Sequence, residues 1–210
     1  MCGQMGYTFV EGRDGLRRLI RNDSRVDASE GPTYRDYLLK PFGKVESIFV
    51  GNDVTPARWG YKPEWSKELI FCTRIETAFE KPFWRKMIQT SRCIIPVSYF
   101  IEFHYDQYGK SPWKIHWKRT PIFFLGGIFS KDSDNNWFSV VTQAANETMR
   151  EVHNGGDNPG RQPVIIRPEN VEAWLNGSLI SETEVIKIAS FYESEEISAG
   201  PEKEPEPTLF

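Results

Sequence analysis

The stretch from residue 93 to residue 142 constrains the fold most, because it holds four short runs of apolar, β-branched or aromatic side chains. The runs cover residues 93–103, 113–118, 122–129 and 137–142, and polar turns separate them. Short runs of this composition between turn residues are typical of β-strands. Many short strands with few helices favour an α+β domain built around a curved, mostly antiparallel sheet or barrel.

The remaining elements are expected to lie around this sheet. Residues 45–50 and 69–74 are strand-like, each bounded by Gly, Pro or charged residues. Four helices are predicted, at residues 15–22 (amphipathic, with Leu16, Leu19 and Ile20 on one face), 80–92, 168–175 and 181–190. Pro82 is tolerated in a first helical turn, and Ser181 with Glu184 has the spacing of a capping box. The sequence therefore predicts peripheral helices around one sheet.

Length and hydropathy limit the class of protein. A chain of 210 residues, of which 39% are apolar, can bury one sizeable core. No apolar run approaches the ~20 residues that a membrane helix requires. The first ten residues lack the basic and apolar regions of a secretory signal. We therefore expect a cytoplasmic, monomeric protein with no membrane partner.

The charge is unevenly distributed along the chain. The net charge of −3 conceals a tail, residues 193–210, that carries six Glu and one Lys, whereas residues 1–192 carry 25 basic and 23 acidic residues. The Glu- and Pro-rich tail is predicted to be disordered, which leaves residues 2–192 as the folded domain. A nucleic-acid footprint on this near-neutral body must be a local patch.

The three cysteines, Cys2, Cys72 and Cys93, are few, odd in number and without CxxC spacing. This pattern argues against a disulfide framework and against a structural zinc site. We expect no metal and no cofactor. At least one thiol is then available for chemistry in a reducing compartment.

Cys2 offers chemistry that no internal residue has. Methionine aminopeptidase removes Met1 when residue 2 is small, and removal leaves a 1,2-aminothiol at the new terminus. The α-amine has a reference pKa of roughly 8, well below that of lysine at roughly 10, so a useful fraction is nucleophilic at pH 7. The amine can form an imine with an aldehyde, and the thiol can close it to a thiazolidine. The alternative is that Cys2 is an incidental residue of the terminus.

Several blocks occur together in a recognisable order. They are Met1-Cys2-Gly3, Trp59-Gly60-Tyr61-Lys62-Pro63-Glu64-Trp65, Arg74-Ile75-Glu76-Thr77-Ala78, Glu80-Lys81-Pro82-Phe83, Arg92-Cys93-Ile94-Ile95-Pro96, Phe100-Ile101-Glu102-Phe103, Val141-Thr142, and His153 followed by Arg161-Gln162-Pro163-Val164-Ile165. The ordered set resembles the SOS-response-associated peptidase (SRAP) family over residues 2 to about 175. The resemblance implies one SRAP-type domain that crosslinks covalently to abasic sites in single-stranded DNA through Cys2. The family name also implies peptidase activity, which in its most limited form would be the autocatalytic removal of Met1.

The resemblance implies two further catalytic residues, Glu102 and His153. Ile101 and Phe103 flank Glu102, and apolar surroundings raise a carboxyl pKa, which suits a proton donor for opening the abasic sugar ring. A solvent-facing Glu on an alternating strand is the alternative. His153 has a reference pKa of roughly 6.5 and can shuttle the proton released in imine formation. An ordinary loop histidine is the alternative there.

The sequence departs from the family pattern at three places. Cys72 stands where the family usually has an asparagine, and a thiol cannot replace an amide, which both donates and accepts hydrogen bonds. Gln4 stands where an arginine is typical, which removes one phosphate contact. Residues 153–161 form a longer loop than is common, and its glycines predict a flexible hinge beside the site.

Cations interleaved with aromatic residues predict the DNA-binding surface. The cations are Arg58, Lys62, Arg74 and Lys81, and the aromatics are Trp59, Tyr61, Trp65 and Trp84. Cations on phosphates and aromatics under splayed bases hold single strands without sequence preference. The alternative is that most of the tryptophans are core, as expected for Trp84. Arg74 and Trp59 are the favoured contacts, with Arg58, Lys62 and the position of Cys72 beside them.

Two rival functions fit part of the sequence. The opening MCGQMGY also resembles glutamine amidotransferases of the N-terminal-nucleophile class, in which the cysteine attacks a carboxamide. Their larger αββα sandwich and the downstream blocks argue against this function. The second rival is a non-catalytic module that binds single-stranded DNA.

The chain ends in two large apolar residues, Leu209 and Phe210. At the end of a disordered tail they are costly to leave in water unless they dock. The ending resembles peptides that bind the bacterial DNA sliding clamp, although Glu206 replaces the usual leading glutamine. The sliding clamp is therefore a predicted partner, and a meaningless ending is the alternative.

Overall fold

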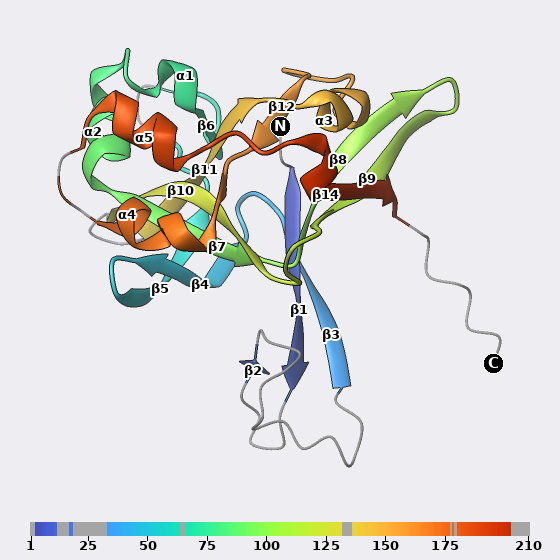
Figure 1. Ribbon diagram of the computed structural model, residues 1–210, viewed down its shortest axis with the longest axis horizontal. Coiled ribbons are helices and arrows are strands. Elements are labelled where there is room, and N and C mark those ends of the chain that lie inside the picture. The colour runs from blue at the N-terminus through green and yellow to red at the C-terminus, as the bar shows by residue number, and fades with distance from the viewer. Residues whose placement is uncertain are drawn as a thin grey trace.

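A computed structural model describes residues 3–11, 17–18, 33–63, 66–131, 136–176, 178 and 180–202. Two β-sheets pack against each other, and the helices gather mainly on the outer side of the larger sheet, as Figure 1 shows for α2, α4 and α5. This is an α+β fold with mixed, mainly antiparallel sheets. The predicted fold class is confirmed.

The smaller sheet has the strand order β14-β9-β8-β1-β2, and β3 also pairs with β1. Its strands are β1 (Gln4–Glu11), β2 (Arg17–Arg18), β3 (Thr33–Leu39), β8 (Tyr99–Asp106), β9 (Gly109–Trp117) and β14 (Ile197–Pro201). Every pair in it is antiparallel. β8 and β9 form a hairpin that extends beyond the helices (Figure 1).

The larger sheet curls into a nearly closed ring. Its strands are β4 (Lys44–Val50), β5 (Asp53–Trp59), β6 (Cys72–Arg74), β7 (Arg92–Val97), β10 (Phe123–Lys131), β11 (Asn136–Ala144), β12 (Arg161–Pro163) and β13 (Ile165–Ile166). Pairing runs from β11 through β5, β4, β7 and β10 back to β11. β4 and β7 share a single register pair, Phe49 with Ile94. The predicted curved sheet is therefore a ring, in which the pairings of β4 with β7 and of β5 with β11 are short.

β11 connects the ring to the candidate site. It pairs in parallel with β5 and with β6, and the β6 register sets Cys72 against Val140 and Arg74 against Thr142. It also pairs antiparallel with β12. Because β11 is buried along nearly its whole length, β6 and β12 are held on a rigid support.

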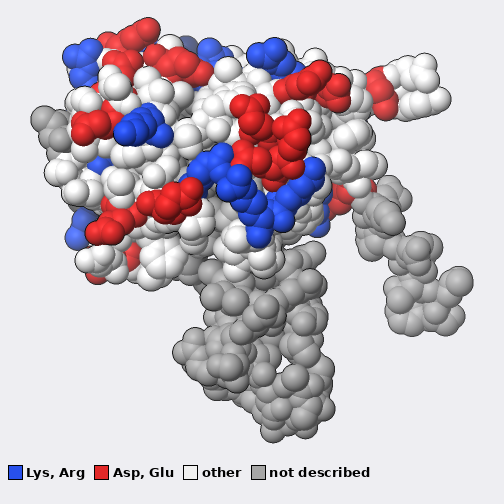
Figure 2. Space-filling view, viewed as in Figure 1, with Lys and Arg blue, Asp and Glu red and all other residues white. Residues whose placement is uncertain are grey.

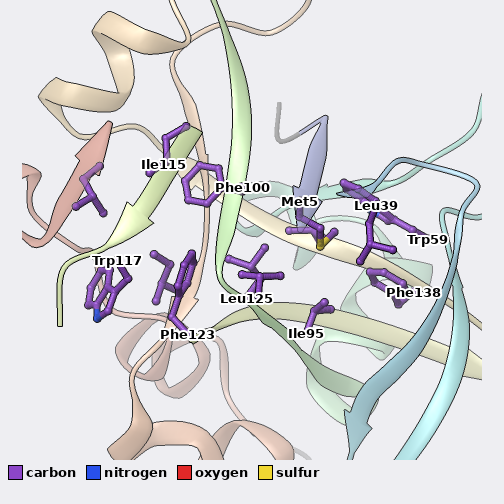
Figure 3. Close-up of a cluster of buried hydrophobic side chains, with 14 of the residues drawn as sticks. Met5, Leu39, Trp59, Ile95, Phe100, Ile115, Trp117, Phe123, Leu125 and Phe138 are labelled. Atoms are coloured by element: carbon purple, nitrogen blue, oxygen red, sulfur yellow. The ribbon is translucent and has the colours of Figure 1, made fainter. Parts of the chain in front are cut away.

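The core between the sheets explains why the predicted runs became strands. Side chains from both sheets fill it, among them Met5, Leu39, Trp59, Phe100, Ile115, Leu125 and Phe138 (Figure 3). β7 is buried at all six positions, as expected for a continuous apolar run that has neighbours on both faces. A second apolar cluster lies beneath the helices and includes Ile88, Val164, Trp174 and Val185.

The helices are short. They are α1 (Ile75–Ala78), α2 (Pro82–Thr90), α3 (Glu147–Val152), α4 (Val171–Leu175) and α5 (Glu182–Ile188), with 3₁₀ turns η2 (Pro168–Asn170) and η3 (Ser194–Glu196). α2 begins at Pro82, and the capping box of Ser181 and Glu184 opens α5, so both predictions are confirmed. No helix in the described part of the chain is long and apolar enough to span a membrane.

One helix prediction is wrong where the structure describes it. Of residues 15–22 only Arg17–Arg18 is described, and it forms β2, whose partners on β1 are Val10 and Glu11. Strand pairing with β1 replaces the amphipathic helix that the spacing of apolar residues predicted. The rest of that range lies outside the described residues.

The first part of the predicted disordered tail is folded. Residues 194–201 form η3 and β14, and β14 adds an edge strand to β9, with Ile197 opposite Trp117. Glu196 forms ion pairs with Arg167 at 2.8 Å and with Arg119 at 2.7 Å. The folded body therefore continues past residue 192, because the ion pairs with Arg119 and Arg167 compensate the charge of Glu196. Residues 203–210, including Leu209 and Phe210, lie outside the described residues.

The Ile197→Ala substitution tests whether β14 belongs to the folded body. Ile197 is 2% exposed, and truncating such a side chain typically costs about 2–5 kcal/mol of unfolding free energy. We expect a loss in this range in denaturant-unfolding curves. Ser198→Ala, an exposed position on the same strand, is the control and should change stability by less than about 0.5 kcal/mol. Equal, negligible effects of the two substitutions would show that β14 contributes nothing to the fold.

Candidate active site

The candidate site lies where β1 begins. Gln4, its first residue, pairs with Ile101 of β8, and Glu102 is the next residue along that strand. Helix α3 contacts both β8 and β12. Met1 and Cys2 lie outside the described residues, whereas the residues around the start of β1 are described.

Glu102 is buried. Its side chain is 1% exposed, and the residue pairs with Trp113 of β9. Burial raises the pKa of the carboxyl to about 7, although the positive charge of the chain's amino terminus acts in the opposite direction. Glu102 is therefore not a solvent-facing residue of an alternating strand. Near neutral pH it can hold a proton and give it up.

His153 ends helix α3 as its C-cap residue. Its side chain is 4% exposed, and the ring Nδ1 lies 3.2 Å from the backbone oxygen and 3.3 Å from the backbone nitrogen of Arg161. Burial, with the amino-terminal charge acting in the same direction, lowers the pKa of the imidazole to about 4. The ring is therefore neutral at pH 7 and can accept a proton.

Helix α3 is fixed to β8 by side-chain and backbone contacts. The side chain of Asn146 caps the helix by accepting from the Met149 N–H at 2.8 Å. Beyond the helix, the Asn154 side chain accepts from the Tyr105 N–H and donates to the Tyr105 carbonyl, both at 2.9 Å. These contacts hold His153, one residue before Asn154, against the strand that carries Glu102.

A salt bridge that the sequence did not reveal joins the site to helix α1. Arg161 donates to both carboxylate oxygens of Glu76, at 2.8 and 2.7 Å, and Glu76 also accepts from the Ala144 N–H. Burial would raise the pKa of Glu76, but the contacts with Arg161 outweigh it and hold the pKa below its usual value. Glu76 and Arg161 are 85 residues apart, so no local spacing pattern could have indicated the pair.

Cys72 belongs to the same group of side chains. Burial raises the pKa of its thiol to about 12, the amino-terminal charge lowers it, Glu102 raises it and Arg161 lowers it. Arg161 likewise acts on His153. The structure thus brings together Cys72, Glu102, His153 and Arg161, and the amino-terminal charge acts on the first three of these.

A pocket of about 230 Å³ opens beside Cys72. Arg74 and Lys81 are exposed and line it, and Trp84 forms another part of its wall. The guanidinium of Arg74 also donates a hydrogen bond to the side chain of Asn158. Arg58 and Lys62 are exposed as well, but neither lines this pocket.

Trp59 does not have the role expected of it. Its side chain is fully buried, its ring stacks on Phe138, and its Nε1–H donates to the Phe71 carbonyl at 2.8 Å. A ring held in this way has no face for a nucleic-acid base. Trp59 is a core residue, as is Cys93, whose pKa burial raises.

The loop from His153 to Gly160 uses its glycines for close packing. A Cβ on Gly155 would lie 2.7 Å from the Tyr105 ring, and Gly156 has a φ of +76°. Both features exclude larger residues without a local shift. The glycines let the loop lie against Tyr105 of the β8–β9 hairpin. Close packing therefore explains these glycines, in addition to the flexibility expected from the sequence.

No group of three or more His, Cys, Asp or Glu that could hold a metal ion occurs among the residues that the structure describes. The groups gathered at the site are an acid, an imidazole, a thiol and cations.

Comparisons with known proteins identify a family and several similar proteins. Residues 1–203 match the model of the SOS response associated peptidase (SRAP) family. The chain is 30% identical over 190 residues to the abasic site processing protein YoqW of Bacillus subtilis, covering 84% of this chain and 80% of that protein. It is 28% identical to YoaM of the same organism, covering 95% and 89%. A crystal structure of a protein from Bacteroides thetaiotaomicron superposes with a TM-score of 0.69 at 27% identity, covering 80% of this chain and 78% of that one.

Proposed function

The chain belongs to the SRAP family, and from this premise we propose that it crosslinks covalently to abasic sites in single-stranded DNA through Cys2. Relatives over most of the chain's length carry the name abasic site processing protein, which supports this choice of substrate. DNA repair is the corresponding cellular role.

One observation carries the proposal: a raised-pKa acid and a neutral imidazole lie where the first strand begins. Glu102 and His153 both respond to the amino-terminal charge, and β1 pairs with β8 immediately before Glu102. Two Cα–Cα steps of about 3.8 Å separate Cys2 from Gln4, so the reactive residue cannot be far from these groups.

The chemistry needs one acid and one base. In the ring-closed abasic sugar, Glu102 protonates the ring oxygen while the C1′ hydroxyl gives its proton to solvent. The bond between C1′ and the ring oxygen breaks, and the C1′ aldehyde is freed. The α-amine of Cys2 adds to C1′, and loss of water gives an imine. The Cys2 sulfur then adds to the same carbon, and its proton passes to the nitrogen, which completes a thiazolidine.

His153 is the proposed proton carrier in the later steps. With a pKa near 4 the ring is neutral at pH 7 and a weak base, so it takes the proton that the amine releases on attacking C1′ only transiently and passes it to the hydroxyl that leaves as water. The backbone of Arg161 orients the ring, and the salt bridge from Arg161 to Glu76 holds that backbone in place. Arg161 and Glu76 are positioning residues in this mechanism.

The test is a crosslinking assay run beside a glutaminase assay. Purified protein is incubated with a single-stranded oligonucleotide carrying one abasic site, with the intact oligonucleotide as control, and SDS gels are examined for a shifted band. We expect a shift with abasic DNA only and no hydrolysis of glutamine. Glutamine hydrolysis without a shift would support the amidotransferase alternative. Binding without a shift would indicate a non-catalytic module.

Cys72→Asn should be tolerated and should speed crosslinking by about 2- to 10-fold, the effect of one added net hydrogen bond. Burial keeps the thiol protonated, whereas an amide at this position can both donate to and accept from the sugar. Single-turnover rates at saturating DNA measure the change. Cys72→Ala is the matched control and should not accelerate the reaction. A Cys72→Asn protein that unfolds, beside a folded Cys72→Ala protein, would assign Cys72 to packing alone.

A further inference from the structure

Three aromatic rings from separate parts of the chain lie nearly parallel on the outside of the ring sheet. Tyr61 stacks on Trp137 of β11 with centroids 4.2 Å apart and an angle of 11° between the rings. Phe83, at the start of α2, lies 6.2 Å from Tyr61 at 15° and 6.5 Å from Trp137 at 18°. We call Trp137, Tyr61 and Phe83 the aromatic stack.

The three rings of the aromatic stack differ in exposure. Trp137 is buried, Tyr61 is partly buried, and Phe83 is 39% exposed. Because Phe83 is 6.2 Å from Tyr61 and 6.5 Å from Trp137, it lies beside the pair of inner rings and not at the end of a column. Its contacts with the two inner rings fix its orientation, while part of the Phe83 side chain remains exposed.

The aromatic stack shares a wall with the pocket of the candidate site. The backbone of Tyr61 exchanges hydrogen bonds with Ile70 at 2.9 and 2.7 Å, and Ile70 lines the pocket. Phe83 meets Trp84 edge-on at 4.8 Å, and Trp84 also lines the pocket. β6, which carries Cys72, also lines the pocket. The pocket is thus lined both by residues that contact the aromatic stack and by Cys72, one of the groups of the candidate site.

Cations lie at and beside the pocket. Arg74 and Lys81 are exposed and line the pocket, and Lys62 is exposed next to Tyr61. The first turn of α2 contains no acidic side chain. Figure 2 shows acidic and basic side chains interspersed over the face of the molecule that it views, without a broad positive field. Local cations beside an aromatic face suit a phosphate backbone with splayed bases.

We propose that the aromatic stack is a base-stacking subsite for a nucleotide next to the abasic residue, with Arg74 and Lys81 on the intervening phosphates. The proposal rests on the proposed function, because abasic single-stranded DNA is the strand that occupies the pocket. Phe83 provides a π-face and no hydrogen-bonding group, so the subsite accepts any base. It contributes affinity and register and takes no part in the bond-forming steps.

The experiment uses DNA that cannot react. An oligonucleotide carries a tetrahydrofuran abasic analogue, which has no aldehyde, and a fluorescent 2-aminopurine at one flanking position at a time. Stacking on an aromatic ring quenches 2-aminopurine, so a quenched position marks the stacked base. We expect quenching at a flanking position with wild-type protein and its loss in Phe83→Ala, with affinity about 5- to 50-fold weaker.

The controls separate stacking from general damage to the surface. Phe191→Ala removes the same side chain at a similar exposure, 44%, away from the pocket, and should leave quenching and affinity unchanged. Phe83→Trp should keep the quenching. A plot of log K against log salt concentration has a negative slope. Lys81→Ala should make this slope less steep by about 0.7, the value for one phosphate contact on a single strand. Thermal unfolding of each variant confirms that it is folded.

The outcomes distinguish this proposal from the proposed function. If Phe83→Ala binds within twofold of wild type and keeps the quenching, or if Phe191→Ala loses both equally, the subsite is wrong. If natural abasic DNA fails to crosslink while the Phe83-dependent quenching persists, the subsite stands and the covalent chemistry is wrong. With active wild-type protein, Phe83→Ala should raise the DNA concentration for half-maximal crosslinking and leave the maximal rate unchanged.

Discussion

Replacing Cys2 with alanine is expected to abolish the SDS-stable adduct with abasic single-stranded DNA. Once Met1 is removed, the Cys2→Ala variant still offers an α-amine, which can form the imine but lacks the sulfur that closes the ring. The imine hydrolyses on denaturation. Borohydride reduction before denaturation should therefore restore a band in Cys2→Ala. A band that Cys2→Ala gives only after reduction would show that the amine reacts first and that the thiol then makes the adduct stable.

Two controls define which group reacts. Cys93→Ala, at a buried cysteine of the core, should crosslink as the wild type does if it folds. A protein with an N-terminal extension, in which Cys2 has no α-amine, should give no adduct with or without borohydride. An extended protein that crosslinks as well as the native one would refute the α-amine mechanism.

Glu102→Gln is expected to slow adduct formation by about 10²–10⁴-fold, the usual range for loss of a general acid or base. Glutamine has nearly the same shape and retains hydrogen bonding, so the affinity for DNA should not change. Single-turnover crosslinking and equilibrium binding to the tetrahydrofuran oligonucleotide separate the two effects. A Glu102→Gln protein with wild-type rates would remove Glu102 from the mechanism.

The pH dependence provides an independent check of the same residue. Because the pKa of Glu102 is about 7, the acid form is depleted as the pH rises past 7, and the wild-type rate should fall on that side. This limb should be absent in Glu102→Gln. The folded pKa lies above the unfolded value of 4.5, so Glu102 stabilises the fold less as the pH rises from about 4.5 through 7. Relative to wild type, Glu102→Gln should therefore be more stable at pH 8 than at pH 5 in denaturant unfolding.

Local patterns predicted the strands well and their partners poorly. The run at residues 93–103 is a single apolar stretch in the sequence, but the structure divides it at Ser98 into β7 and β8, which belong to different sheets. Composition indicates that such a stretch is extended and buried. Which strand it pairs with depends on residues far away in the chain, and the sequence alone carries no local trace of them.

The site shows the same limit. Glu102 and His153 could be named from the family resemblance, but their burial and the resulting pKa directions required the tertiary structure. The sequence favours Trp59 as a DNA contact because it is interleaved with the cations Arg58 and Lys62, whereas its ring is packed inside the core. A tryptophan beside cations has the same local sequence in either setting.

Composition misled at the end of the chain. Residues 193–202 contain four glutamates, which favoured disorder, yet Ile197 is buried and Glu196 has two arginine partners. An acidic segment folds when the body supplies cations at matching positions. Arg119 and Arg167 come from elsewhere in the sequence, so this match could not be seen beforehand.

The pairing of strands from distant parts of the chain has a consequence for when activity is acquired. β1 joins β8, β6 joins β11, and β9 joins β14. Chains dominated by such pairings fold slowly, because long loops must close before the contacts that stabilise them can form. The acid lies on β8, the thiol on β6 and the imidazole after α3. A nascent or partly unfolded chain therefore carries its amino-terminal residues without the acid and the imidazole, and in the proposed mechanism the help of these two groups is acquired together with the native topology.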